Sequence, residues 1–285
     1  MSFRQNVTKL AHKAGGSFKT REARTSGVNK LASYLQAENI QIKQIDHLKL
    51  KHVQGFVQSR VDAGVSVRTI QNELSSIRVT LREANRDRLA ATIDNKALGV
   101  SGASRDGTKE AIPDERYGQL LDAVVRLDPG VGAVVELQRW LGLRAEEAVK
   151  ACKSLKDWKQ QLERGVPVHL IYGSKGGRVR NIHPADREQA LQAVNHALDV
   201  ARACRGVLID KPNEREAMYR YHNVMRAAGF CGKHSGHSLR YTFAQGQIVA
   251  YQEKGFSRAD ALAKTSMDLG HGDGRGRYVA RVYGK

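Results

Sequence analysis

The chain has 285 residues, of which 41% are hydrophobic and 27% charged, with a mean hydropathy of −0.49, and its length suits two domains of roughly 100–200 residues each. It has no run of about 20 apolar residues, no apolar signal-peptide core in residues 1–16 and no CxxC pair among its three cysteines; we therefore expect a protein of the reducing cytoplasm without a membrane span or a cysteine metal site. Lysine and arginine outnumber aspartate and glutamate by 47 to 29, which gives a formal charge of +18 and a pI near 10.0. This surplus favours a polyanionic partner, most commonly nucleic acid, over a basic protein that binds no polyanion.

Residues 1–95 are predicted to form a small helical domain. Apolar residues recur there at spacings of three and four, which is typical of one buried face on each of several helices. Ser66 is a candidate N-cap for the last of these helices. The apolar stripes consist of Val28, Leu31 and Leu35, of Val53, Phe56, Val57 and Val61, and of Val67, Ile70, Leu74, Ile77, Leu81 and Ala84.

Three arginines of the last helix, Arg78, Arg82 and Arg86, are spaced four residues apart and are therefore predicted to share one helical face. On an isolated helix this pattern would indicate a solvated face. Because residues 1–100 hold about half of the positive surplus of the chain, we expect these arginines to contact DNA phosphates instead.

Residues 96–112 are predicted to be a linker, because they have few large apolar residues and are rich in glycine, serine and charge. Pro113 then opens a helical segment, and residues 113–285 are predicted to form a larger, mainly helical domain. Its strand signal lies in residues 166–184, where an apolar β-branched run, the turn GSKGG and a second extended run predict a β-hairpin. The expected fold class is therefore mostly α with a small β-hairpin or sheet.

Four short motifs of the second domain carry side chains that can act on a phosphate. Taken singly, each has an ordinary interpretation as a helix ion pair, a solvated turn lysine or a hydrogen-bonded histidine. We expect the first pair to lie on a helix and the pair in GHSLR to share one helical face. The candidate residues are Arg144 and Glu147 in GLRAEE, Lys175 in GSKGG, His237 and Arg240 in GHSLR, and His271 in LGHGDG.

In this combination and order, the motifs resemble those of the tyrosine recombinase (phage integrase) family, which has GLRxxE, a lysine in a β-turn, HxxR, LGH and a tyrosine near the end. The resemblance is specific over residues 142–283, and the upstream helices are similar to the DNA-clamping domain of that family. It implies a core-DNA-binding domain in residues 1–95 and a catalytic domain in residues 113–285. The implied active site contains Arg144, Lys175, His237, Arg240, His271 and one tyrosine, with Glu147 at the supporting acidic position.

These residue types suit the cleavage of a DNA phosphodiester. A tyrosine hydroxyl can attack the phosphorus and form a 3′-phosphotyrosine, while two arginines grip the non-bridging oxygens in a forked geometry. Histidines can hydrogen-bond the phosphate or move protons, and a lysine can protonate the departing 5′ oxygen. Because arginines replace metal ions and the covalent link stores the bond energy, we expect no metal, ATP or other cofactor.

Tyr283 and Tyr278 are the two candidates for the nucleophile. In the family the tyrosine usually follows the LGH histidine by about nine positions, which falls here on Ala280. Tyr283 is favoured because RVY resembles the apolar-then-tyrosine ending of the family better than GRY does, and because the glycines of GDGRGR can absorb an insertion. Tyr278 would then pack or stack on DNA. Arg275 and Arg277 are expected to guide this segment along the DNA backbone, or else to form a solvated loop.

The resemblance implies a site-specific recombinase that integrates or excises a mobile element. A type IB topoisomerase-like enzyme and a catalytically inactive DNA-binding relative are the alternatives. The resemblance also implies that the protein binds double-stranded DNA and acts as a homotetramer on paired sites. It further implies DNA-bending factors of the host or the element and a location in the cytoplasm at the nucleoid. Many members continue into a helix that docks on a neighbouring subunit, whereas only Gly284 and Lys285 follow Tyr283; that helix is expected to be missing, removed or replaced.

Overall fold

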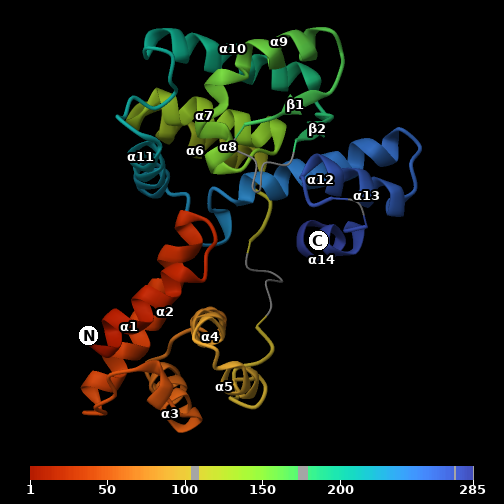
Figure 1. The fold of residues 1–285 in the computed structure, drawn as a ribbon. Coiled ribbons are helices and arrows are strands. Elements are labelled where there is room, and N and C mark those ends of the chain that lie inside the picture. The colour runs from red at the N-terminus through yellow and green to blue at the C-terminus, as the bar shows by residue number, and fades with distance from the viewer. Residues whose placement is uncertain (104–108, 173–178, 273, 285) are drawn as a thin grey trace. The chain divides into compact units, whose positions relative to one another are not determined.

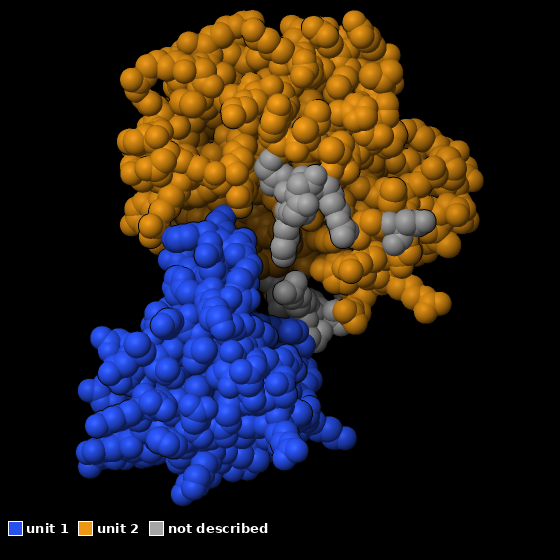
Figure 2. All heavy atoms as spheres, viewed as in Figure 1, with its two compact units in different colours: residues 1–104 blue, residues 105–285 orange. Residues whose placement is uncertain are grey.

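The protein is described from a computed structural model that defines residues 1–103, 109–172, 179–272 and 274–284. The chain divides into two compact units, Met1–Ser104 (unit 1) and Arg105–Lys285 (unit 2), which Figure 2 colours separately. The division falls inside the segment that is predicted to be a linker. Each unit has its own hydrophobic core.

Unit 1 is built from helices packed around one core (Figure 1). Ser66 begins α4 as predicted, because its hydroxyl accepts a hydrogen bond from the Thr69 backbone N–H at 3.3 Å. The predicted apolar stripes form most of the core, although Val61 and Val67, near helix ends, are 47% and 39% exposed. The helices are α1 (Phe3–Lys13), α2 (Phe18–Ala37), the 3-10 helix η1 (Ile45–His47), α3 (Leu50–Asp62), α4 (Val67–Glu83) and α5 (Asp87–Thr92).

The prediction that Arg78, Arg82 and Arg86 share one helical face is wrong for Arg86. Helix α4 ends at Glu83, and Asn85 adopts a left-handed conformation with a φ of 57°. The chain therefore turns before Arg86, which precedes α5 instead of continuing α4. Arg82 is exposed on the last turn of α4.

The guanidinium groups of Arg78 and Arg86 both cap backbone carbonyls within unit 1. Arg86 donates to the carbonyls of Ile45 and Leu48 at 2.7 and 3.1 Å. Arg78 donates to the carbonyl of Ile93 at 2.9 Å. These hydrogen bonds tie Arg86, at the start of α5, to η1 and Leu48, and tie Arg78 of α4 to the end of α5, so both side chains have a structural use.

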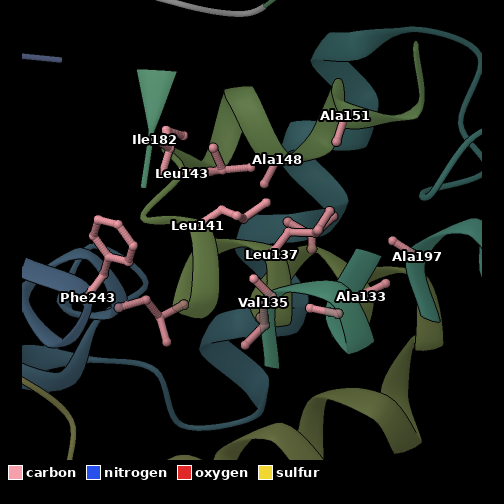
Figure 3. Packing of buried hydrophobic residues seen from close by; sticks show 14 of the residues in the cluster. Ala133, Val135, Leu137, Leu141, Leu143, Ala148, Ala151, Ile182, Ala197 and Phe243 are labelled. Atoms are coloured by element: carbon pink, nitrogen blue, oxygen red, sulfur yellow. The ribbon is translucent and has the colours of Figure 1, made fainter. Parts of the chain in front are cut away.

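Unit 2 is mainly helical, with α7 packed against α6, α10 and α12 (Figure 1). Figure 3 shows part of its core, in which Leu137 and Leu141 of α7 lie among residues such as Ala148 of α8 and Phe243 of α12. Helix α7 is buried along most of its length because most of its residues are apolar. The elements are α6 (Asp114–Leu127), α7 (Pro129–Leu141), α8 (Ala145–Val149), η2 (Ala151–Lys153), α9 (Leu155–Glu163), β1 (Val168–Leu170), β2 (Arg180–Ile182), α10 (Arg187–Ala203), α11 (Glu214–Ala227), η4 (Gly232–His234), α12 (Ser238–Glu253), α13 (Arg258–Asp268) and α14 (Gly276–Tyr283).

The predicted β-hairpin is confirmed by the antiparallel pairing of β1 with β2, which places Leu170 opposite Arg180. The indole N–H of Trp158 donates to the carbonyl of His169 at 2.8 Å and so holds β1 on α9. The turn residue Lys175 lies outside the described residues. The expected fold class, mostly α with a small β-sheet, is confirmed.

In the described part of the chain, no helix is both long and apolar enough to cross a membrane. Helix α2 spans 20 residues, but lysine, arginine and glutamate side chains interrupt it.

Candidate active site

Arg144 lies at the junction of two helices, and not within a helix as predicted. Gly142 ends α7 with a φ of 59°, and a Cβ atom there would lie 2.3 Å from the ring of Phe243, so only glycine fits. Arg144 is the N-cap residue of α8, and its backbone N–H donates to Glu147 Oε2 at 2.7 Å. Arg144 Nη1 donates to Glu147 Oε1, also at 2.7 Å. Glu147 therefore orients both the main chain and the side chain of Arg144.

Arg240 lies in the first turn of α12 and is only 1% exposed. Its guanidinium donates to the carbonyl of Gly142 and, at 2.7 Å, to the carbonyl of Leu269. Arg144 Nη2 reaches the same Leu269 carbonyl at 3.4 Å. The two arginines thus converge on one oxygen, although they are almost a hundred residues apart in the sequence. Burial, followed by the charge of Arg144, lowers the pKa of Arg240 to about 10, so Arg240 stays protonated at neutral pH.

Arg180 is not among the predicted site residues, yet it lies directly against Glu147. It donates from Nη1 to Oε1 and from Nη2 to Oε2 of that carboxylate, both at 2.7 Å. Burial alone would raise the pKa of Glu147, but the hydrogen bonds and charges of Arg180 and Arg144 lower it to about 2. The sequence signal for Arg180 is its position two residues before Ile182, because residues two apart in a strand lie on the same face, which is buried here.

His271 and Tyr283 lie next to each other, close to this arginine cluster. The Tyr283 hydroxyl lies 3.3 Å from His271 Nε2, and Tyr283 is 2% exposed. Burial lowers the pKa of His271 to about 4, and the charges of Arg240, Arg144, Arg275 and Arg180 add to this shift. His271 is therefore neutral at pH 7, with a ring nitrogen able to accept a proton.

Aromatic side chains surround the ring of Tyr283. Tyr241 lies edge-on to it with ring centroids 4.5 Å apart, and the His237 ring lies at 6.5 Å. Tyr278 lies 6.4 Å from Tyr283 and packs edge-on to His271 at 5.1 Å. The ring centroids of His271, Tyr278 and Tyr283 therefore lie at the corners of a triangle with sides of 5.1, 5.9 and 6.4 Å, and the Tyr283 hydroxyl faces His271 Nε2. Helix α14, which carries both tyrosines, is attached to α13 by a segment in which Gly270, Gly272 and Gly274 have positive φ angles.

The remaining predicted residues are less closely tied to the cluster. His237 is an exposed N-cap residue of α12, three residues before Arg240. Arg275 and Arg277 are exposed at the start of α14. Lys175 cannot be placed, because it lies outside the described residues.

Asp268, a buried residue that the motifs did not indicate, supports the turn formed by the LGH motif. Asp268 accepts hydrogen bonds from Tyr251 Oη at 2.7 Å and Gln247 Nε2 at 2.8 Å. It also accepts one from the backbone N–H of His183 at 3.1 Å. These contacts join α12, α13 and the end of β2 immediately before Leu269, whose carbonyl both arginines share.

The described ranges gather no cluster of three or more histidine, cysteine, aspartate or glutamate side chains that could hold a metal ion. A buried tyrosine hydroxyl beside a neutral histidine and two converging arginines suits the transfer of a phosphoryl group to tyrosine. The class of protein that such a site defines is an enzyme acting on phosphodiesters.

Comparison with protein families agrees with this class. A family model described as "Integrase" matches residues 99–246, and one described as "Phage integrase, N-terminal" matches residues 1–90. The chain therefore belongs to the phage integrase (tyrosine recombinase) family, and the resemblance drawn from its motifs is confirmed. Arg144 and Arg240 lie inside the first match, whereas His271 and Tyr283 lie beyond it. Comparison with curated protein sequences finds no match.

Solved structures share the fold. A lambda integrase dimer bound to a COC′ core site superposes with a TM-score of 0.65 at 15% identity, over 99% of this chain and 77% of that chain. A lambda integrase tetramer bound to a Holliday junction gives 0.64 at 17% identity, over the same shares. The Tn1549 transposon integrase in complex with circular intermediate DNA gives 0.60 at 15% identity, over 99% of this chain and 95% of that chain.

Proposed function

We propose that this protein is a site-specific DNA recombinase that cleaves and rejoins duplex DNA through a 3′-phosphotyrosine on Tyr283. The observation that carries the proposal is the Tyr283 hydroxyl, 3.3 Å from His271 Nε2 and beside the buried Arg240. Membership of the integrase family and the +18 charge support DNA as the substrate. Integration or excision of a mobile element is the biological role proposed with it.

In the first step the Tyr283 oxygen attacks the scissile phosphorus while its proton passes to His271 Nε2. A neutral histidine can accept this proton, and the depressed pKa of His271 keeps it neutral in the free protein. The new bond joins the tyrosine oxygen to phosphorus, and the bond from phosphorus to the 5′ oxygen breaks. We assign protonation of that oxygen to Lys175, as the family resemblance implies. Rejoining reverses these steps, with a 5′ hydroxyl as the attacking group.

Arg144 and Arg240 are assigned to the phosphate. A guanidinium has five N–H donors, and Arg240 uses two of them to donate hydrogen bonds to the carbonyls of Gly142 and Leu269. Arg144 is 30% exposed and can turn its free donors to an incoming oxygen. His237, at the exposed edge of the site, is assigned a hydrogen bond to the same phosphate.

The near-complete burial of Arg240 and Tyr283, at 1% and 2% exposure, has a consequence for DNA entry. We propose that α14 moves before a phosphate reaches Arg240, because Tyr283 lies near that guanidinium and both side chains are buried. Gly270, Gly272 and Gly274 suit a segment that changes conformation, because a residue without a Cβ atom has a wide choice of backbone angles. We propose that DNA binding shifts α14 and so controls when the nucleophile is available.

We further propose that the enzyme acts as a tetramer on paired sites, because recombination requires two duplexes to be cut and exchanged. The lambda integrase tetramer on a Holliday junction supports this proposal through the shared fold. DNA-bending factors and a nucleoid location belong to the same proposal. A type IB topoisomerase would relax supercoiled DNA without pairing two sites, and an inactive relative would bind DNA without forming an adduct.

Trapping the covalent intermediate tests the proposal. DNA duplexes that bind the protein are selected from a random-sequence pool and then nicked. The nick lets the short fragment with the new 5′ hydroxyl diffuse away after attack, so that rejoining is prevented. These substrates are incubated with the protein in EDTA. Wild-type protein and Tyr278→Phe should form a covalent protein–DNA adduct, whereas Tyr283→Phe should bind DNA and form none. An adduct in Tyr283→Phe but not in Tyr278→Phe would make Tyr278 the nucleophile. No adduct in wild-type protein, or a strict Mg²⁺ requirement, would refute the mechanism.

A further inference from the structure

Arg180 is a buried arginine that contacts the active site through Glu147, the carboxylate that holds Arg144. It lies on β2, is 8% exposed and makes two parallel hydrogen bonds of 2.7 Å to Glu147. The antiparallel register opposite Leu170 and the buried neighbour Ile182 fix the position of its strand. Its guanidinium is therefore held in place before any DNA binds.

Glu147 is shared between two arginines. Its side chain is fully buried, and both of its oxygens accept from Arg180 while Oε1 also accepts from the Arg144 side chain. A buried carboxylate needs a positive partner at close range. Without Arg180, that partner would be Arg144 alone.

The charges of the cluster show what Arg180 adds. Arg144, Arg180 and Arg240 carry three positive charges and Glu147 one negative charge, so this group has a net charge of +2. Removal of Arg180 would leave +1 and would pair Arg144 fully with Glu147. The phosphorane formed during strand cleavage gains negative charge, and fixed positive charge nearby stabilises it.

Arg180 also supports the turn that carries the shared carbonyl. A Cβ atom on Gly270 would lie 2.8 Å from Arg180 Cδ, so the turn packs directly on the arginine stem. Gly270 has a φ of 68° and separates Leu269 from His271. The same side chain thus touches both the carboxylate that holds Arg144 and the turn that holds His271.

We propose that Arg180 is a positioning residue whose charge neutralises Glu147, so that Arg144 keeps its full positive charge for the scissile phosphate. It does not touch the substrate. The inference rests on the proposed function, because it assigns Arg144 to a phosphate. A purely structural ion pair would join β2 to α8 and have no effect on the charge available to DNA.

Three variants of the full-length protein separate these roles. Arg180→Met removes the charge but keeps an unbranched side chain. Arg180→Met with Glu147→Gln removes one positive and one negative charge, which restores the net charge of +2. Arg180→Lys keeps the charge and loses the forked geometry. Thermal unfolding establishes which variants fold.

Single-turnover cleavage of the nicked substrate gives the first measurement. Arg180→Met should slow adduct formation by about tenfold to a hundredfold. This range is taken by analogy from metal enzymes, in which loss of a residue that orients a metal ligand costs about that much activity. The double variant should cleave faster than Arg180→Met, and Arg180→Lys should stay near the wild-type rate. A double variant as slow as Arg180→Met, or slower, would overturn the inference. If Arg180→Met does not fold, an Arg180→Lys rate far below that of the double variant would overturn it.

The pKa of His271, followed by NMR, gives a second measurement that does not depend on cleavage. The groups that face this ring are Arg144, Arg180, Arg240, Arg275, Tyr278 and Tyr283. Loss of the Arg180 charge should raise the pKa of His271, and the double variant should return it toward the wild-type value. An unchanged pKa in Arg180→Met would overturn the inference. Because this titration needs no DNA, it tests the effect of the Arg180 charge on the site even if wild-type protein forms no adduct, so failure of the inference and failure of the proposed function are distinguishable.

Discussion

Arg78 and Arg86 of unit 1 and the active-site arginines of unit 2 make different kinds of contact. In unit 1, Arg78 and Arg86 donate to backbone carbonyls of neighbouring loops. In unit 2, Arg144 and Arg180 meet on one carboxylate, and Arg144 and Arg240 meet on one carbonyl. A carbonyl carries only a partial charge, and each unit 1 arginine satisfies its carbonyls separately. The unit 2 arginines instead concentrate more positive charge than their single carboxylate can neutralise.

Arginines in such a pattern can donate to carbonyls of their own unit, so contact of Arg78, Arg82 and Arg86 with DNA stays a prediction. Spacing along the sequence suggested a phosphate-binding face in unit 1, but two of its three members complete the folding of the unit. The partners distinguish the two uses, because Arg78 and Arg86 donate to carbonyls, whereas Arg144 and Arg180 share one buried carboxylate beside a third, buried arginine, Arg240. Like charges gathered in a buried site are unfavourable unless a ligand of opposite charge compensates them. In unit 2 the positive charge left over after pairing with Glu147 is what suits a phosphate ligand.

The largest effect is expected from Arg240→Ala. Loss of one preorganised donor to transition-state charge costs about 2.7–4 kcal/mol, or roughly a hundredfold to a thousandfold in rate. Single-turnover adduct formation should fall by that factor while DNA affinity falls little. Arg202→Ala, which removes a 74% exposed arginine of α10, is the matched control and should cleave normally. An Arg240→Ala variant that keeps more than half of the wild-type rate would remove this arginine from the site.

The corresponding change in unit 1 should affect folding instead of chemistry. Arg86→Ala leaves the carbonyls of Ile45 and Leu48 without their donor, which should lower the free energy of unfolding by about 1–3 kcal/mol. Urea unfolding followed by circular dichroism measures this loss. Arg82→Ala, which removes an exposed side chain of the same segment, should leave stability nearly unchanged. Equal stability of the two variants would contradict the capping role of Arg86.

Much of the fold followed from the sequence because its signals are local. The apolar stripe of α4, the Ser66 cap and the hairpin around residues 166–184 each depend on neighbours within a few positions. The end of α4 was missed because Asn85 takes a left-handed conformation that an apolar stripe does not reveal.

The site followed from the sequence only where motifs exist. Arg144, Arg240, His271 and Tyr283 belong to short patterns, and the structure brings them together. Arg180 and Asp268 act through contacts with residues far away in the chain, so no short pattern contains them. A charged residue at a core-facing strand position is the one local hint that Arg180 offered.

A smaller effect is expected on the salt dependence of DNA binding. If exposed Arg82 contacts a phosphate, Arg82→Ala should reduce the slope of log affinity against log salt by about one unit. Arg86→Ala should keep the wild-type slope at temperatures where it is folded, because its guanidinium is committed to carbonyls. Fluorescence anisotropy at several salt concentrations measures both. An unchanged slope in Arg82→Ala would remove Arg82 from the predicted phosphate contacts of unit 1.

The smallest effect concerns the pH dependence of stability, which reports the charge concentrated in unit 2. The pKa of His271 is about 4 in the folded protein, against about 6.5 for an ordinary histidine. Between these values the unfolded chain binds more protons than the folded one, so stability should fall as the pH falls from about 6.5 to 4. Glu147, with a pKa of about 2, adds a second loss below about pH 4.5, because its stabilising charge disappears on protonation. His271→Gln should flatten the upper part of this curve and leave the lower part, whereas His169→Gln, which removes an exposed histidine of β1, should keep the wild-type shape. Thermal unfolding midpoints at pH 7, 5.5, 4.5 and 3.5 make the comparison, and an unaltered curve in His271→Gln would mean that burial and the arginine charges do not depress the pKa of His271.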